Sequence, residues 1–285
     1  MTGTGTENDP YIVDNIADFR TACQKKSEVY VELSSDIDCM DDETISDGWT
    51  TLRINCKKID GKGHTIKNIY TTAGYTSDMI VLMNSGLSEG IHNLNFENIF
   101  FNHTGNGCLF HSSGAGYFKN CNFSGIINSS SDYCFCNASI GMTKCTFNFK
   151  IYSTKTSGFR FSYSSMESCE VRLDVSAVKT SGTANTIARY FKNSYAVGSI
   201  KFQNTDVNAS KTRMFYSAGN SYIAMSVVNV GSGFKFSDTN VNLACFYNAD
   251  LLENAEFEAQ DNVYSLTTEQ CKDRDYLNSI GFVVV

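Results

Sequence analysis

"FKNCNF" at residues 118–123, "MTKCTF" at 142–147 and "MESCEV" at 166–171 share one pattern that returns every 24 residues. Each copy starts with an apolar residue, has a cysteine at its fourth position and ends in Phe or Val. A fixed interval of this length is the sequence signature of a repeat architecture. The three cysteines could therefore belong to a disulfide framework, to a metal site, or to the core of a repeated unit.

Looser copies extend the repeat in both directions, at 91–96, 191–197, 222–227 and 251–257. The copies at 191–197 and 251–257 are one residue longer, and the positions aligned with the cysteine are Leu94, Cys121, Cys145, Cys169, Tyr195, Met225 and Ala255. Because this position accepts side chains of very different size, it is typical of a core site, where cysteine acts as a small hydrophobe. We therefore expect the cysteines to be buried free thiols.

The other two interpretations of the cysteines have weaker support. The chain has 11 cysteines, an odd number that cannot all pair within one molecule. The close pair Cys134 and Cys136 has no histidine or second pair near it in register that would complete a zinc site. We predict no metal ion and no cofactor, and disulfides stay the second alternative.

Apolar and polar residues alternate inside each copy, as Cys145, Phe147, Phe149 and Ile151 show. A period of two predicts half-buried β-strands, and helical periodicity is missing between 29 and 262. Repeats of this length, built from short strands and turns rich in Asn, Gly and Ser, are typical of solenoids of parallel strands. The predicted fold class is all-β: a single right-handed parallel β-helix of about eight or nine coils.

Each end of the chain carries a helical pattern. Ile16, Phe19 and Cys23 have the spacing of one helix face, and Asp14 can cap that helix. Since a solenoid must cover its end strands, we expect an amphipathic helix that caps the first coil.

The C-terminal pattern predicts a second, short helix. Thr267 and Gln270 have the spacing of a capping box, and Gly281 is the expected end of the helix. The predicted parts of the chain are an N-terminal cap with the first coils (1–57), the parallel β-helix (58–262), and a C-terminal capping helix with its tail (263–285).

Composition excludes some partners. The net charge is −7 and no run of Lys or Arg exceeds two residues, so the sequence predicts no nucleic-acid surface. No apolar run is long enough to span a membrane. The first residues, "MTGTGTENDPYIV", have neither a basic nor an apolar region, so no secretory signal is expected.

Three stretches resemble known β-helix proteins. "GTGTENDPYIV" (3–13) and "IDGKGHTIKNI" (59–69) are similar to the opening of pectate-lyase-like proteins, which are right-handed parallel β-helices. "LTTEQCKDRDYLNSIGF" (266–282) resembles the terminal segment of β-helix proteins from gut-associated bacteria and their phages, including virion spikes and fibres. The resemblance implies the fold over nearly the whole chain, but a fold of this kind hosts unrelated functions.

The resemblance also offers a test for catalysis. Related polygalacturonase-like hydrolases carry N-T-D, D-D, G-H-G and R-I-K segments on consecutive coils. Here "RIN" (53–55) lies in the wrong place, Asp41–Asp42 precedes the regular coils, and G-H-G does not occur. The aligned calcium-binding aspartates of pectate lyases are also missing. The sequence therefore favours a protein that is not an enzyme.

One charged patch stays as a catalytic candidate if the protein is an enzyme. Glu170, Arg172 and Asp174 are expected to point outward, in register with Thr146, Asn148 and Lys150 on the preceding coil. The patch could do acid–base chemistry on a glycan, or could be a stabilising ladder of opposite charges. Because residues four apart on a strand lie about 13 Å apart, farther than glycosidase carboxylates, the ladder is the favoured interpretation.

The histidines give no stronger candidate. His64, His92, His103 and His111 are expected on different coils, without a shared register and without an adjacent Cys or carboxylate partner. Such histidines are more often ordinary turn or surface residues than ligands or catalysts.

The leading functional hypothesis is a structural or adhesive virion component, a head or tail spike or fibre of a bacteriophage. It would assemble in the host cytoplasm as a homotrimer, contact other virion proteins, and touch host-surface carbohydrate through its free end or flank. The sides of the rod carry aromatics such as Tyr163 and Tyr190, which suits copies bundled side by side. The alternatives are a β-helix polysaccharide lyase or glycoside hydrolase, and an adhesin on a bacterial cell surface.

Overall fold

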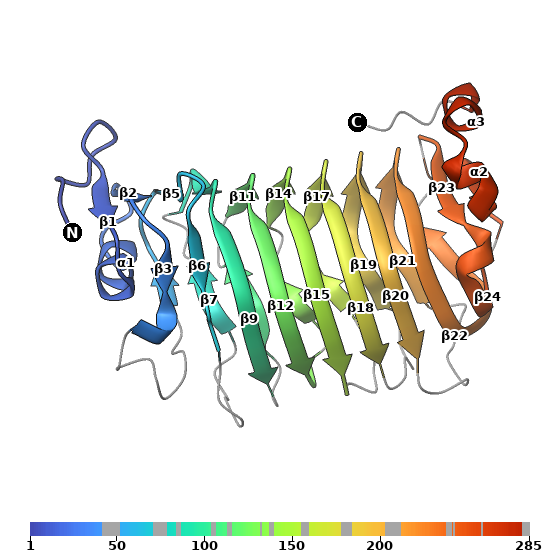
Figure 1. Cartoon of the computed structure of the whole chain (residues 1–285), viewed down its shortest axis with the longest axis horizontal. Helices are drawn as coiled ribbons and strands as arrows, with labels where there is room; N and C mark the ends of the chain where they lie inside the picture. Colours follow the sequence, from blue (N-terminus) through green and yellow to red (C-terminus); the bar gives the residue numbers. More distant parts are fainter. Residues whose placement is uncertain are drawn as a thin grey trace.

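The structure is a computed structural model of the chain. It describes residues 1–41, 52–70, 79–83, 87–103, 107–112, 116–131, 133–136, 140–154, 160–177, 184–202, 212–237, 241, 243–257 and 259–280. The chain forms a parallel β-solenoid of the right-handed type, in which successive turns stack side by side from the N-terminal to the C-terminal end (Figure 1). The predicted fold class is therefore confirmed at this level.

Each turn contributes strands to three faces of the solenoid. Face 1 consists of β1 (Tyr11–Val13), β2 (Tyr30–Leu33), β5 (Lys58–Asp60), β8 (Gly90–His92), β11 (Tyr117–Lys119), β14 (Gly141–Thr143), β17 (Ser165–Glu167), β19 (Ala184–Lys192) and β21 (Thr212–Gly219). Face 2 consists of β3 (Ile37–Asp38), β6 (Thr65–Lys67), β9 (Asn95–His103), β12 (Asn122–Ser129), β15 (Thr146–Ser153), β18 (Glu170–Ala177), β20 (Tyr195–Phe202), β22 (Tyr222–Ser237) and β24 (Leu252–Phe257).

Face 3 is shorter and lies across the core from the other two. It consists of β4 (Leu52–Ile54), β7 (Met79–Met83), β10 (Cys108–Ser112), β13 (Tyr133–Cys136) and β16 (Arg160–Ser162). Two further strands near the C-terminal end, β23 (Cys245–Asn248) and β25 (Val263–Leu266), pair with each other, and β23 also pairs with the start of β22. The 3-10 helices are Cys39–Asp41 and Ala249–Leu251.

Aromatic rows fill the core. Phe123 on β12 pairs with Phe96 on the turn before and Phe147 on the turn after, and its ring stacks on theirs at 5.3 Å in both directions. From face 3, Phe135 meets the rings of Phe123 and Phe147 edge-on, at 5.2 Å each. These separations lie within the favourable range for aromatic pairs, so the alternating pattern of the sequence becomes a continuous row along the solenoid.

The corner between faces 1 and 2 explains the repeated cysteines. At six successive corners the residue just before the repeated position has φ between 47° and 54°; these residues are Asn93, Asn120, Lys144, Ser168, Asn193 and Asn220. The side chain that follows points inward and, in five cases, donates to the carbonyl oxygen two residues earlier. The donors are Cys121, Cys145 and Cys169, each at 3.4 Å, Ser194 at 2.7 Å and Ser221 at 3.0 Å.

The structure corrects the repeat after Cys169. The next residues in the row are Ser194 and Ser221, followed by Cys245, and Tyr195 pairs instead with Glu170 on the outer side of face 2. Assignment of Tyr195, Met225 and Ala255 to this row was therefore wrong. From Cys121 onward the row consists of small side chains with a hydrogen-bond donor, which serine and cysteine both supply, while Leu94 fills the first of these corners without a donor.

The number of full coils is also smaller than predicted. Within the described residues, six turns carry a face 2 strand of eight or more residues, and these strands are β9, β12, β15, β18, β20 and β22. The first face 2 strands, β3 and β6, have only two and three residues. The regular solenoid therefore has about six turns and not eight or nine, because the turns near its ends are shorter.

The N-terminal helix α1 (Ile16–Cys23) occurs where the sequence predicted it. Its buried residues are Ile16, Phe19, Ala22 and Cys23. Asn15, not Asp14, is the N-cap, and its side chain accepts from the backbone N–H of Asp18 at 2.9 Å. Asp14 instead accepts from the Asn15 side chain. The role of α1 as a cap of the first coil stays a prediction.

The C-terminal pattern forms two helices. Thr267 and Gln270 make the predicted capping box at the start of α2 (Thr268–Lys272). Asp273 then caps α3 (Arg274–Ser279), so the chain bends where one continuous helix was expected. Gly281 lies outside the described residues, and the division of the chain at 57 and 262 stays a prediction.

All 11 cysteines are free thiols, as the sequence predicted. Ten of them are buried, and Cys271 is half-buried.

Substitutions of Cys145 test the corner. Cys145→Ser should change the free energy of unfolding by less than about 1 kcal/mol, because Ser194 and Ser221 already serve the same role elsewhere. Cys145→Ala should cost about 1–2 kcal/mol, and Cys145→Asp several kcal/mol, because its carboxylate would be buried. Urea unfolding measures the three values. Equal tolerance of Asp and Ser would mean that the side chain does not face the core.

Candidate functional site

The predicted charged patch has the predicted register. On β18, Glu170, Arg172 and Asp174 lie opposite Thr146, Asn148 and Lys150 of β15. The Arg172 Nε pairs with the Glu170 carboxylate, and the Ser199 hydroxyl donates to Asp174 at 2.7 Å. Each carboxylate therefore already has a partner on its own or the next strand, which is the arrangement of a cross-strand ladder. A catalytic role for the three residues stays a prediction.

The histidines do not lie on four separate coils. His92, His103 and His111 belong to one turn, on its three faces, because β8, β9 and β10 follow one another in that turn. His64 does have a carboxylate partner, since its Nδ1 lies 3.3 Å from Asp36. Both expectations were wrong, because they depended on turn boundaries that the sequence does not mark.

His92 and Tyr117 form a contact that the sequence did not predict. The Nε2 of His92 lies 2.8 Å from the carbonyl oxygen of Glu89 and 3.1 Å from the Tyr117 hydroxyl. Burial lowers the pKa of His92, so its ring is neutral at pH 7, and burial raises the pKa of Tyr117. A neutral imidazole beside a phenol can exchange a proton, but its ring nitrogen is already bound to the backbone.

A second network lies next to this pair. The Lys57 ammonium lies 2.8 Å from the Tyr30 hydroxyl and 2.9 Å from the Glu89 carboxylate. The contacts with Tyr30 and Glu89 raise the pKa of Lys57, and the contact with Lys57 lowers the pKa of Glu89. Because both shifts favour the charged forms, Lys57 and Glu89 act as an ion pair and not as a catalytic base.

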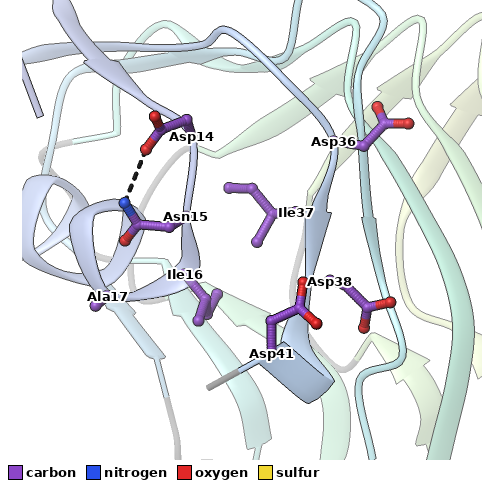
Figure 2. Close-up of a pocket in the computed structure, with 8 residues that line it drawn as sticks. All are labelled: Asp14, Asn15, Ile16, Ala17, Asp36, Ile37, Asp38 and Asp41. Atoms are coloured by element: carbon purple, nitrogen blue, oxygen red, sulfur yellow. Dashed lines mark hydrogen bonds between the residues drawn. The ribbon is translucent and has the colours of Figure 1, made fainter.

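A hollow of about 300 Å³ lies between α1 and β3 at the N-terminal end (Figure 2). Its lining includes the carboxylates of Asp14, Asp36, Asp38 and Asp41. Two of them are bound to the next turn, because Asp36 accepts from the Thr65 backbone N–H at 2.9 Å and Asp38 accepts from Asn68 at 2.7 Å. These two hydrogen bonds join β3 and the residue before it to the next turn, so the two carboxylates have a structural role at this junction.

Tyrosine and arginine side chains gather on another surface. We call it the Tyr–Arg face, and it consists of Tyr133, Arg160, Tyr163, Arg189, Tyr190 and Tyr216. These residues come from β13, β16, β19, β21 and the turn after β16, and so belong to four successive turns. At about 4.8 Å per turn, the face extends along the solenoid axis for about 14 Å.

Stacking holds the Tyr–Arg face together at its first end. Tyr133 and Arg160 are paired across neighbouring strands, and the guanidinium carbon lies 5.0 Å from the centre of the Tyr133 ring. The guanidinium also donates to the Tyr133 hydroxyl. Tyr163 meets the Tyr133 ring edge-on at 5.8 Å. These contacts fix the orientation of both rings.

Arg189 organises the other end of the Tyr–Arg face. Its guanidinium lies 4.7 Å from the ring centre of Tyr163, 5.1 Å from that of Tyr190 and 5.7 Å from that of Tyr216. Tyr190 is 39% exposed, and the other members of the face are half-buried. The result is a preordered surface of ring faces, hydroxyl groups and guanidinium groups.

The sequence held a signal for this face. Tyr163, Tyr190 and Tyr216 are 27 and 26 residues apart, which is one turn in each case. The sequence predicts Tyr163 and Tyr190 as surface aromatics, but it does not single out Arg160 and Arg189 as their neighbours.

The described residues give no support for a metal site or for a membrane-spanning helix. Among the residues that the structure describes, no group of three or more His, Cys, Asp or Glu is placed to hold a metal ion. No helix in the same part of the chain is long and apolar enough to cross a membrane.

Comparisons with known proteins support the fold. No protein-family model and no curated protein matches the sequence. Among solved structures, the chain is similar to a protein from Bacteroides ovatus described as a "putative immunoglobulin A1 protease", with a TM-score of 0.55, 16% identity, and coverage of 98% of this chain and 90% of that chain. At this identity the likeness shows the shared fold alone. The resemblance to pectate-lyase-like proteins and virion spikes stays a prediction beyond it.

Acid should weaken the junction between β3 and the next turn. The hydrogen bonds from Asn68 and from the Met40 backbone lower the pKa of Asp38. A carboxyl whose pKa is lower in the folded state stabilises it above the unfolded pKa, near 3.9, and loses that effect as the pH falls through the folded value. Asp38→Asn should therefore lower the urea midpoint at pH 7, and this difference should shrink at pH 3.

Asp14→Asn is the matched control for Asp38→Asn. Its carboxylate lines the same hollow but accepts only from the neighbouring Asn15 among the bonds described here. It should change the midpoint little at either pH. A loss for Asp38→Asn that is equally large at pH 3 and pH 7 would show that the carboxylate charge does not stabilise the junction.

Proposed function

We propose that this protein is a non-enzymatic adhesive β-solenoid whose Tyr–Arg face binds an extended carbohydrate chain on a host surface. The observation that supports the proposal is the preordered row of Tyr133, Tyr163, Tyr190 and Tyr216, in which one arginine stacks on the first ring and a second lies over the other three. Sugar rings present C–H groups that pack on aromatic faces, and hydroxyl groups that pair with phenols and guanidinium groups.

The shape of the face favours an extended ligand. Its members follow the solenoid axis over about 14 Å, so a linear glycan could contact several rings in succession. Because Arg160 and Arg189 hold the rings in place, little side-chain entropy would be lost on binding. A single terminal sugar would use only part of this surface.

The absence of the known hydrolase and lyase motifs supports binding without cleavage. The carboxylates of the Glu170, Arg172 and Asp174 ladder and of the Lys57–Glu89 pair all have partners within the solenoid, which is typical of a structural role. A polysaccharide lyase or glycoside hydrolase of the β-helix type is the competing proposal.

The assembly we propose is a homotrimer that forms part of a bacteriophage virion, as a head or tail spike or fibre. A solenoid of about six full turns reaches only about 30 Å, so attachment to a larger particle would give it reach. Cyclic symmetry suits such attachment, and repeated copies would raise the avidity of weak glycan contacts. An adhesin on a bacterial cell surface is the alternative setting.

Glycan binding is the first test. On an array of bacterial capsular and mucosal polysaccharides, the protein should bind at least one extended glycan. Tyr190→Ala should weaken that binding about tenfold, the equivalent of about 1.4 kcal/mol, because it removes the most exposed ring of the face. Biolayer interferometry with the immobilised glycan measures the change.

Tyr152→Ala is the matched control. Tyr152 is also exposed, at 41%, and also lies under a cation, Lys150, but it belongs to face 2 and stands apart from the Tyr–Arg face. It should leave glycan binding unchanged. Equal loss in both variants would remove the support for the Tyr–Arg face, and release of oligosaccharides that Glu170→Gln or Asp174→Asn abolishes would establish the enzyme instead.

The assembly has a separate test. Light scattering on the purified protein should give about three times 31.5 kDa. A stable monomer at micromolar concentration would contradict the homotrimer, without bearing on glycan binding.

A further inference from the structure

The end of α1 is held against the turn between β4 and β5. The carbonyl oxygen of Cys23, the last residue of α1, accepts from the backbone N–H of Asn55 at 2.7 Å and from that of Cys56 at 3.2 Å. The Asn55 side chain donates to the carbonyl oxygen of Gln24 at 3.1 Å. Three hydrogen bonds thus join the helix to a turn more than 30 residues away along the sequence.

The thiols of Cys23 and Cys56 meet at this contact. Both residues are completely buried, with 0% exposure, and the Cys56 thiol is close enough to raise the pKa of the Cys23 thiol. A disulfide needs α-carbons about 4.4–6.8 Å apart and side chains that converge. The backbone hydrogen bond from Cys56 to Cys23 brings the two residues into direct contact, and the effect of the Cys56 thiol on the pKa of Cys23 places the two side chains next to each other.

We propose that Cys23 and Cys56 form a disulfide when the chain folds under oxidising conditions, and that this bond fixes α1 to the first turns of the solenoid. Each thiol loses its hydrogen, a sulfur–sulfur bond forms, and a disulfide oxidant such as oxidised glutathione is reduced to two thiols. The closed loop contains β2, β3 and β4, and with them three of the four carboxylates of the N-terminal hollow, those of Asp36, Asp38 and Asp41.

The row of core cysteines does not meet the same conditions. Cys121, Cys145 and Cys169 occupy equivalent corners of successive turns, so their side chains point the same way and stand about 4.8 Å apart. That spacing exceeds the 3.5–4.5 Å that a disulfide requires between β-carbons. These three thiols should stay reduced and serve as internal controls.

Because both thiols are buried in the folded protein, the Cys23–Cys56 disulfide can form only if the oxidant is present while the chain folds. Burial and the contact with Cys56 raise the pKa of the Cys23 thiol, so the reactive thiolate is scarce once the chain has folded. An oxidant in solution also has no access to a side chain with 0% exposure. The disulfide therefore forms during folding, and it records whether the compartment in which the chain folded was oxidising.

Refolding the full chain tests the proposal. The protein is unfolded in urea with reductant, refolded in mixed reduced and oxidised glutathione or in reductant alone, and then denatured, alkylated with iodoacetamide and digested with trypsin. Mass spectrometry should find the peptides 21–25 and 54–57 cross-linked after oxidative refolding and alkylated otherwise. The peptides with Cys121, Cys145 and Cys169 should be alkylated in both samples.

Two further measurements sharpen the result. The cross-linked protein should unfold at a higher urea concentration than the reduced protein, and dithiothreitol should abolish the difference. Cys56→Ser should show no such difference; if this variant does not fold, the peptide map of the unmodified protein decides alone. Alkylated thiols at Cys23 and Cys56 after oxidative refolding to the native circular dichroism spectrum would overturn the proposal. Equally fast cross-linking of the folded, reduced protein would overturn its dependence on folding.

Discussion

The corner between faces 1 and 2 is the constraint on which the rest of the structure depends. The chain turns there within two residues, with one residue in the left-handed region followed by one side chain that points inward. At Lys144 the backbone has φ of 54°, and the thiol of Cys145 then donates to the Thr143 carbonyl oxygen at 3.4 Å. Because a non-glycine residue resists the left-handed region, the hydrogen bond and the packing of neighbouring corners must offset the cost.

Neighbouring corners support one another through asparagine side chains. The amide of Asn120 donates to the side-chain oxygen of Asn93 at 3.1 Å, Asn93 donates to Asp60 at 3.0 Å, and Asn220 donates to Asn193 at 2.9 Å. Asparagine tolerates the left-handed region better than most residues and carries both a donor and an acceptor, so it suits a stack in which each turn repeats the last. The corners thereby keep successive turns in register, and this register places the outward side chains of every face.

The Tyr–Arg face follows directly from that register. Tyr163, Arg189 and Tyr216 come from three turns, yet a single guanidinium contacts both rings because the turns are stacked at a constant interval. The same regularity gives the ladder of Glu170, Arg172 and Asp174 its partners. The same scaffold therefore carries two kinds of surface. In the ladder the charged side chains are paired with one another, and in the Tyr–Arg face the aromatic rings are suited to stacking. The proposed adhesive function relies on the second, and the rigidity of the scaffold keeps it ordered without a ligand.

Four features can be predicted from the sequence alone: the all-β solenoid, the burial of the cysteines as free thiols, the register of β15 against β18, and the capping box at Thr267. These features are local or repeat at a constant interval, so a period in the sequence is enough to predict them. That Ser194 and Ser221 continue the row of Cys169 could be seen only in the tertiary structure. A serine hydroxyl replaces a cysteine thiol there because each donates a hydrogen bond to the carbonyl oxygen two residues earlier. The tertiary structure also decided which tyrosines and arginines meet, and that Cys23 lies beside Cys56. Such contacts join residues about one turn or more apart, and their partners depend on the length of each intervening turn, which varies along this chain.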